Sequence, residues 1–296
     1  DERAQANAYM FGGQIAGISA ASAIGGAALM NYGLAPAAVL MAIAVFLIML
    51  LPLLLREREG ERILPWTQGA PSVQALADTK SQWRDIFGSL LRNLILPMSI
   101  LLVVLEGLNR AASGITVAIN PVIAVQELGF SQIGYANWYA TAGIIAAVFG
   151  VLLAPLIDRF GAQRTLGLVV GFRFILFSVI ALFPDNWVSM TYFNGYILMS
   201  YMSGQLVTIT IIALFMKLCF KPIAATQFAV YMASANLTLS LGSALVAPLA
   251  EITDYVGMFM FVAGLNLCFL LLLPLLNFER HATALNEQTY AVRNNA

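Results

Sequence analysis

Long apolar segments, separated by polar connectors, organise the whole chain. Each segment reaches the roughly 20 residues that a helix needs to cross about 30 Å of hydrocarbon. The segments are continuous and rich in Leu, Ala, Ile and Val, without the alternation of lipid-facing and lumen-facing side chains that is typical of a transmembrane barrel. The pattern predicts an all-α polytopic membrane protein with eight spans, near residues 8–29, 34–55, 93–117, 134–156, 165–183, 187–218, 224–250 and 256–276.

The composition excludes an ordinary soluble domain. Of the 296 residues, 60% are hydrophobic and 10% are charged, whereas soluble domains carry roughly 25% charged residues. Mean hydropathy is +0.83. The formal net charge of zero gives no reason to expect a nucleic acid partner. Cys219, Cys268 and the single histidine, His281, have no metal-ligand or disulfide spacing, so we expect no metal site and no cofactor.

The basic residues are confined to alternate connectors. If residues 1–7 are cytoplasmic and the spans alternate in direction, 13 of the 15 Lys and Arg residues fall on the cytoplasmic side. The other two, Arg110 and Arg173, lie inside spans, and the connectors on the opposite side contain none. This distribution follows the positive-inside rule and predicts a cytoplasmic C-terminus.

The connector at residues 56–92 is much longer than the others and separates two spans from six. We expect it to join two helical bundles. The predicted parts are therefore residues 1–55 with two spans, the cytoplasmic linker at 56–92, a six-helix bundle at 93–276 and a cytoplasmic tail at 277–296.

The second half of this linker has an amphipathic helical pattern, which predicts a helix lying in the headgroup plane, with a disordered linker as the alternative. Its apolar face consists of Leu76, Trp83, Phe87 and Leu90, and its charged face of Asp78, Lys80, Arg84 and Asp85.

Small residues recur every fourth position in the first span, at Gly13, Gly17, Ala21 and Gly25. Such a stripe lets another backbone approach closely, so we interpret it as a packing surface. A backbone lining for a solute is the alternative.

An acid and a base lie one helical turn apart in the span at 93–117, which contains Glu106, Asn109 and Arg110. Ionised groups at this depth are costly unless they face protein or water and find partners, so they mark a pathway by default. Desolvation favours the protonated acid, whereas Arg110 favours the carboxylate, and Glu106 is therefore a candidate proton carrier. A structural ion pair is the alternative. Ser113-Gly114 and Asn120-Pro121 predict a kink or an unwound turn further along this span.

Two other spans contain polar candidates. Arg173 lies several residues past a cytoplasmic connector, where it either snorkels to the headgroups or binds an anionic solute. The next span has an unusually polar stretch that includes Gln205 and Thr208. We expect part of this stretch to face a wet cavity.

The connector after the fourth span reads Ala154-Pro155-Leu156-Ile157-Asp158-Arg159-Phe160-Gly161-Ala162-Gln163-Arg164. Asp158 can cap a helix N-terminus and pair with a base, Gly161 permits a tight turn, and Arg159 and Arg164 supply charge, as a cytoplasmic gate requires. This loop resembles the signature loop of the major facilitator superfamily. The long basic linker followed by six spans also resembles that family's C-terminal half. Ala154 stands where the family has Gly, and Ala162 and Gln163 replace basic residues.

Three short stretches resemble AmpG-type muropeptide permeases, in the branch that includes acetyl-CoA transporters: Ala213 to Cys219, Ala224 to Ala229, and Glu127 to Phe130. This resemblance implies that the chain starts before the fifth span of the family, so that earlier spans of the same protein are absent. A hydrophilic start without Met is consistent with that expectation. It also implies that the charged span is the seventh and the polar span the tenth, both facing the central cavity. Glu106 precedes Arg110, whereas AmpG-like proteins place the base first.

Secondary active transport is the function we expect, with proton-driven symport of a solute such as a muropeptide across a bacterial inner membrane by alternating access. Sugars, organic anions and acyl-CoA are alternative solutes. No G-x-x-x-x-G-K-[ST] loop occurs, so we expect no coupling to ATP hydrolysis within this chain. A membrane-embedded transferase would need a nucleophile with a base, a metal cluster or paired acids, and the spans contain none of these, so we expect no enzyme.

Overall fold

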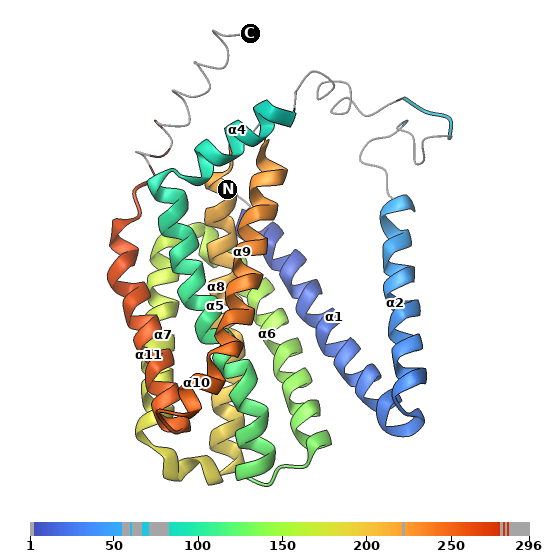
Figure 1. The fold of residues 1–296 in the computed structure, drawn as a ribbon, viewed down its shortest axis with the longest axis vertical. Helices are drawn as coiled ribbons and strands as arrows, with labels where there is room; N and C mark the ends of the chain where they lie inside the picture. The colour runs from blue at the N-terminus through green and yellow to red at the C-terminus, as the bar shows by residue number, and fades with distance from the viewer. Residues whose placement is uncertain are drawn as a thin grey trace. The chain divides into compact units, whose positions relative to one another are not determined.

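The computed structural model of the chain describes residues 3–54, 60, 67–70, 83–220, 223–278, 281 and 283. Its regular secondary structure in these residues is helical (Figure 1). The chain separates into two compact units, a larger one of Asp1–Ser19 with Leu90–Ala296 and a smaller one of Ala20–Ser89.

All eight predicted spans are confirmed as long apolar helices. The spans comprise α1 (Arg3–Tyr32), α2 (Leu34–Leu54), α5 (Pro97–Val122), α6 (Gln132–Phe160), α7 (Ala162–Leu182), α8 (Met190–Leu218), α9 (Ala224–Ala244) with α10 (Val246–Ala250), and α11 (Tyr255–Leu272). Short helical turns extend three connections: the π-helical η2 (Ile123–Glu127) and the 3-10 helices η3 (Pro184–Val188) and η5 (Leu273–Leu275).

Local sequence accounts for several helix ends. Ser131 caps α6 by accepting a hydrogen bond from the backbone N–H of Gly134, and Asp254 caps α11 in the same way from Gly257. The irregularity predicted in the charged span is present near its end, where α5 changes to the π-helical turn η2 just after Pro121. Ser113 and Gly114 instead lie in regular α-helix.

The smaller unit contains the second half of α1 and most of α2, joined at Gly33, whose φ of 85° needs a residue without Cβ. Gly25 faces the Met41 sulfur, which would lie 3.4 Å from an added Cβ. This contact is with a side chain, whereas the glycine stripe predicted the close approach of another backbone.

At Gly13 and Gly17, in the larger unit, added Cβ atoms would meet no described atom within 4 Å, so this part of the stripe has no packing partner among the described residues. The first half of α1 packs through a neighbouring face instead. There Gly12 lies against Val151 of α6, and the Ser19 hydroxyl lies against Gly143.

The linker helix α4 (Trp83–Leu94) is strongly amphipathic, as expected. Leu90 is buried, whereas Phe87 is exposed. The predicted positions Leu76, Asp78 and Lys80 lie outside the described residues.

In the larger unit, α8 is the most buried span and packs against both α6 and α7, while α5 packs closely on α9. Gly114 of α5 and Gly242 of α9 make the second contact possible. A Cβ on Gly114 would clash with the carbonyl oxygen of Leu239, and one on Gly242 would clash with the backbone of Ala111. The two backbones therefore touch at this crossing, as small residues allow in membranes.

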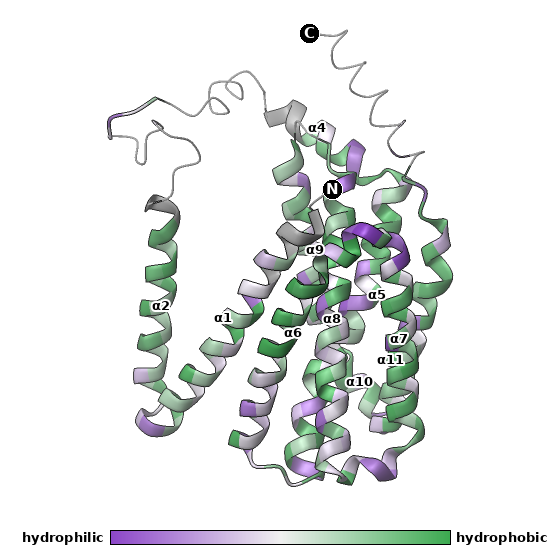
Figure 2. Cartoon of the chain, turned by 180° about the vertical axis from the view of Figure 1, so that it is seen from behind, coloured by the Kyte–Doolittle hydropathy of each residue, from purple (hydrophilic) through white to green (hydrophobic). Residues whose placement is uncertain are grey.

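One end of the larger unit collects the start of α5, the α6–α7 turn, the α8–α9 connection and the end of α11 (Figure 1). Hydrogen bonds join these segments: the Gln163 side chain donates to the Leu276 carbonyl, and the Asn277 N–H donates to the Met98 sulfur. The described basic residues Arg92, Arg159, Arg164 and Lys217 belong to the same helix ends. Figure 2 shows hydrophobic colouring along the spans and hydrophilic colouring in α4 and at many helix ends.

Candidate functional site

A layer of polar side chains crosses the larger unit between two apolar cores. One core contains Ile115, Phe177, Tyr196 and Phe259, and the other contains residues such as Leu102. On each of α5, α7, α8 and α11, buried polar residues occur between the segments that belong to the two cores, although Ser99, Thr116, Asn120 and Thr210 lie within the core segments themselves. We call this the mid-span polar layer, and it consists of Glu106, Asn109, Arg110, Arg173, Ser200, Ser203, Gln205 and Asn266. A polar layer near the middle of apolar helices marks a solute or ion pathway.

Glu106 is the best-satisfied member of this layer. Its side chain is 1% exposed, and its Oε1 accepts a hydrogen bond from Arg110 Nε at 2.6 Å. Its Oε2 accepts another from Asn109 Nδ2 at 3.0 Å. The predicted grouping of these three residues on one helix face is therefore present. Charge-assisted hydrogen bonds of this length are strong, and they compensate for part of the cost of burying the carboxylate.

Arg110 connects this acid to a cavity of about 420 Å³. The Arg110 side chain is 18% exposed, so only part of the guanidinium is covered by protein. Gln205 and Thr208 of α8 line the same cavity, as predicted from their polar stretch. The remaining lining residues, which sequence reasoning did not single out, are Met10, Gln14, Ile15, Ile18, Phe228, Met232 and Asn236.

Gln205 differs from the other polar lining residues because its amide is buried and unpaired. The residue is 1% exposed, and neither Oε1 nor Nε2 has a hydrogen-bond partner among the described residues. Gly150 of α6 makes room for this side chain, since an added Cβ would lie 2.8 Å from Gln205 Cγ. The amide is held in place without an internal partner, which is unusual for a buried polar group.

Arg173 is buried inside the protein and does not snorkel to the headgroups, because it is only 2% exposed. Its Nη1 donates to the Ser200 carbonyl oxygen of α8 at 3.3 Å, and its guanidinium lies 5.2 Å from the centre of the Phe177 ring. Gly204 leaves space for it, at 3.1 Å from an added Cβ to Nη1. Arg173 interacts electrostatically with Glu106 and Arg110, but it is not part of the cavity lining.

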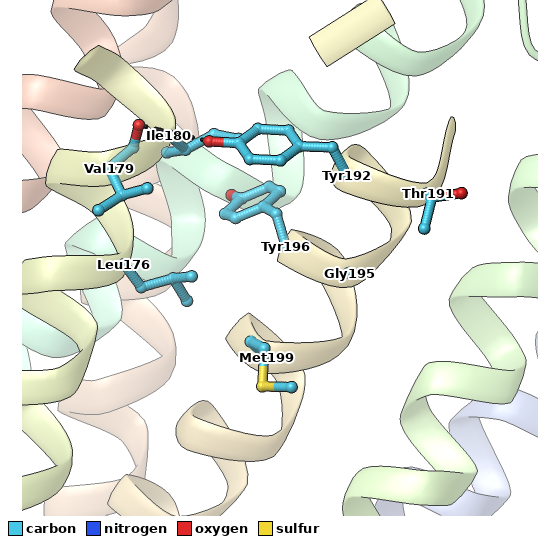
Figure 3. A pocket seen from close by; sticks show the side chains of 8 residues that line it. All are labelled: Leu176, Val179, Ile180, Thr191, Tyr192, Gly195, Tyr196 and Met199. Carbon is cyan, nitrogen blue, oxygen red and sulfur yellow. Dashed lines mark hydrogen bonds between the residues drawn. The ribbon is translucent and has the colours of Figure 1, made fainter. Parts of the chain in front are cut away.

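A second hollow lies between α7 and α8 and is separate from this site. Figure 3 shows Leu176, Val179 and Ile180 on one wall and Tyr192, Tyr196 and Met199 on the other. The Tyr192 hydroxyl donates to the Val179 carbonyl at 3.5 Å, and the Tyr196 hydroxyl donates to Asn120 Oδ1 at 3.2 Å. The hollow measures about 290 Å³ and is almost entirely apolar. It therefore offers little to a polar solute, and the cavity beside Arg110 is the stronger candidate.

The sequence model of the Major Facilitator Superfamily matches residues 1–243. The chain belongs to this superfamily. Membership confirms the expected class of membrane-embedded secondary transporter. No match was found among curated proteins.

The superfamily-like loop adopts the predicted tight turn. Gly161 has a φ of 90° and separates α6 from α7. Asp158 lies in the last turn of α6 and does not cap α7, which begins after Gly161 without a side-chain cap. Arg159 and Arg164 are exposed on either side of the turn. The charges are therefore available at the surface, while Gln163 ties the turn to the end of the last span.

Sequence reasoning did not single out two polar residues of the cavity lining, Gln14 of α1 and Asn236 of α9. Both helices contain other amide and hydroxyl side chains, so the sequence gives no signal that distinguishes these two positions. Only their position in the fold brings them to the cavity of Arg110.

Proposed function

We propose that this superfamily member is a proton-driven symporter that carries an anionic solute, with a muropeptide as the candidate cargo, across a bacterial inner membrane by alternating access. The supporting observation is the contact between Glu106 and Arg110 at the edge of the cavity. A buried acid that shares a site with a solute-facing base provides a proton acceptor whose affinity depends on whether the solute is present.

The charge of the polar layer favours an anion. The layer contains two arginines and one carboxylate, so an ionised layer has an excess positive charge. An uncompensated charge at this depth is costly, and an anionic solute at Arg110 would reduce that cost. An organic anion of another kind is the second candidate, because the excess positive charge of the polar layer favours any anion and does not select the rest of the solute.

The coupling cycle follows from the pairing. A solute carboxylate that binds Arg110 competes with Glu106 for the guanidinium. Glu106 then loses part of its compensation and takes up a proton, so that solute and proton enter the site together. Release on the other side of the membrane reverses both steps.

We further propose that the basic end of the larger unit faces the cytoplasm, together with the C-terminal tail at 277–296, and that the Asp158–Arg164 turn acts there as a gate. The positive-inside distribution supports this orientation. The expected six-helix bundle at 93–276 would then rock against the spans of residues 1–55 across the linker at 56–92.

The test is uptake into vesicles containing the purified protein. A labelled anhydromuropeptide is supplied outside, the interior is made alkaline or acidic, and simple sugars and acyl-CoA serve as competitors. We expect the solute to accumulate in the lumen only when the interior is alkaline, because protons and solute then move inward together. Accumulation that is the same with and without the proton gradient would exclude symport. Stronger uptake of a competitor than of the muropeptide would show that the competitor is the better cargo.

Glu106→Gln tests the proton carrier in the same vesicles. We expect this variant to lose gradient-driven accumulation while it still folds, because Gln retains the size and one acceptor oxygen. The matched control is Glu251→Gln, which makes the same chemical change at an exposed helix end. Unchanged pH dependence of uptake in Glu106→Gln would remove Glu106 from the coupling role.

A further inference from the structure

The Gln205 amide is a buried polar group at the cavity that the proposed transport cycle does not use. It lines the cavity with Arg110 and Thr208, yet both of its polar atoms lack a partner among the described residues. Its stem is held between α8 and Gly150 of α6. An unpaired donor and acceptor on a buried side chain that lines a cavity form a recognition element, because a bound group that pairs with both atoms removes the burial penalty.

We propose that Gln205 selects solutes that carry a neutral amide beside their carboxylate, such as an N-acylated amino acid or the end of a short peptide. This inference rests on the transport function proposed above and specifies the chemistry of its solute. An amide offers an N–H to Gln205 Oε1 and a carbonyl oxygen to Gln205 Nε2, whereas a carboxylate or an ester lacks the donor.

The rest of the cavity lining combines apolar and polar side chains. Met10, Ile15, Ile18, Phe228 and Met232 are apolar, whereas Gln14, Thr208 and Asn236 are polar. An acyl amide brings one donor and one acceptor for Gln205 and apolar carbon for the apolar side chains. Arg110 supplies the cation for the carboxylate.

The experiment compares two solutes that differ at one atom: N-acetylleucine and its ester analogue, in which oxygen replaces the amide N–H. Both are tested for uptake, and for inhibition of anion uptake, in vesicles containing the wild-type protein. We expect the amide compound to act at least about fivefold more strongly than the ester, because the ester leaves Gln205 Oε1 unpaired.

Gln205→Met removes the amide at nearly constant size. We expect this variant to bring the ratio between the two solutes close to one by weakening N-acetylleucine and leaving the ester almost unchanged. Gln205→Asn withdraws the amide by one methylene and gives an independent variant if the Met substitution prevents folding. Thr210→Val is the matched control, since Thr210 is buried on the same helix, bonds to the Leu206 carbonyl and does not line the cavity. It is expected to keep the wild-type ratio.

Several outcomes would overturn the proposal: equal action of amide and ester on the wild type, an unchanged ratio in both Gln205 variants, or stronger action of glucuronate than of either compound. Those outcomes would leave the proposed proton-driven transport of anions unaffected. If no anion accumulates under a proton gradient, the transport proposal fails instead. The amide proposal is then decided by binding, because N-acetylleucine must raise the thermal unfolding midpoint of the detergent-solubilised wild type more than the ester does.

Discussion

Removing Arg110 tests whether Glu106 is a buried carboxylate that depends on its partner. Arg110→Met keeps most of the side-chain volume and deletes the 2.6 Å contact to Oε1. Glu106 remains 1% exposed in the structure, with Asn109 as its other partner. Breaking a buried ion pair in this way costs about 3–5 kcal/mol when the remaining charge stays in place.

Proton uptake limits that cost. A buried carboxylate without its counter-ion can instead take up a proton, and this step becomes easier as the pH falls. We therefore expect Arg110→Met to lose about 3–5 kcal/mol of unfolding free energy at pH 7 and less at pH 5. The loss is smaller in acid because the neutral acid needs no counter-ion.

The assay is unfolding in mixed micelles by titration with SDS, followed by tryptophan fluorescence at both pH values. The double variant Glu106→Gln/Arg110→Met completes the cycle and is expected to be less destabilised than Arg110→Met at pH 7, with little pH dependence. A loss in Arg110→Met that is the same at pH 5 and pH 7, or one below about 0.5 kcal/mol at both, would refute the reasoning.

Four further predictions address the rest of the molecule. Gly242→Ala forces a Cβ into the Ala111 backbone and is expected to cost about 1–3 kcal/mol of unfolding free energy in the same assay. The control Gly264→Ala places its Cβ in open space and is expected to change stability little. Equal losses in the two variants would contradict the backbone contact at the α5–α9 crossing. His281 is buried, and burial lowers its pKa below 6.5, although the contact of Nε2 with the Leu218 carbonyl opposes this shift. Its stabilising contribution is therefore complete above pH 6.5 and is lost as the pH falls further. His281→Gln is expected to flatten the decline in unfolding midpoint from pH 7 to pH 5, and a decline identical to that of the wild type would contradict this prediction. Arg110→Gln is expected to weaken uptake of anionic solutes more than of neutral ones, and equal loss would favour a structural pair. Asp158→Asn is expected to lower the maximal uptake rate with little change in KM, and a change in KM alone would contradict a gate.

Much of the fold was predictable from local pattern. The eight spans follow from the length of the apolar segments, and one bundle end collects the described basic helix ends because adjacent spans alternate in direction. The contact between Glu106 and Arg110 was predictable for the same reason, since residues four apart share a face of one helix whatever surrounds it.

Tertiary structure decided everything that depends on how each helix is rotated and at which depth it lies. A sequence places Arg173, Gln205 and Asn236 within their own helices, but packing determines that Arg173 turns toward α8 and that Gln205 and Asn236 meet at one cavity. The same reason explains which glycines of α1 meet α6. Gly13 and Gly17 have the spacing of an interface, but the rotation of α1 brings Gly12 and Ser19 against α6, and Gly13 and Gly17 contact no described residue there.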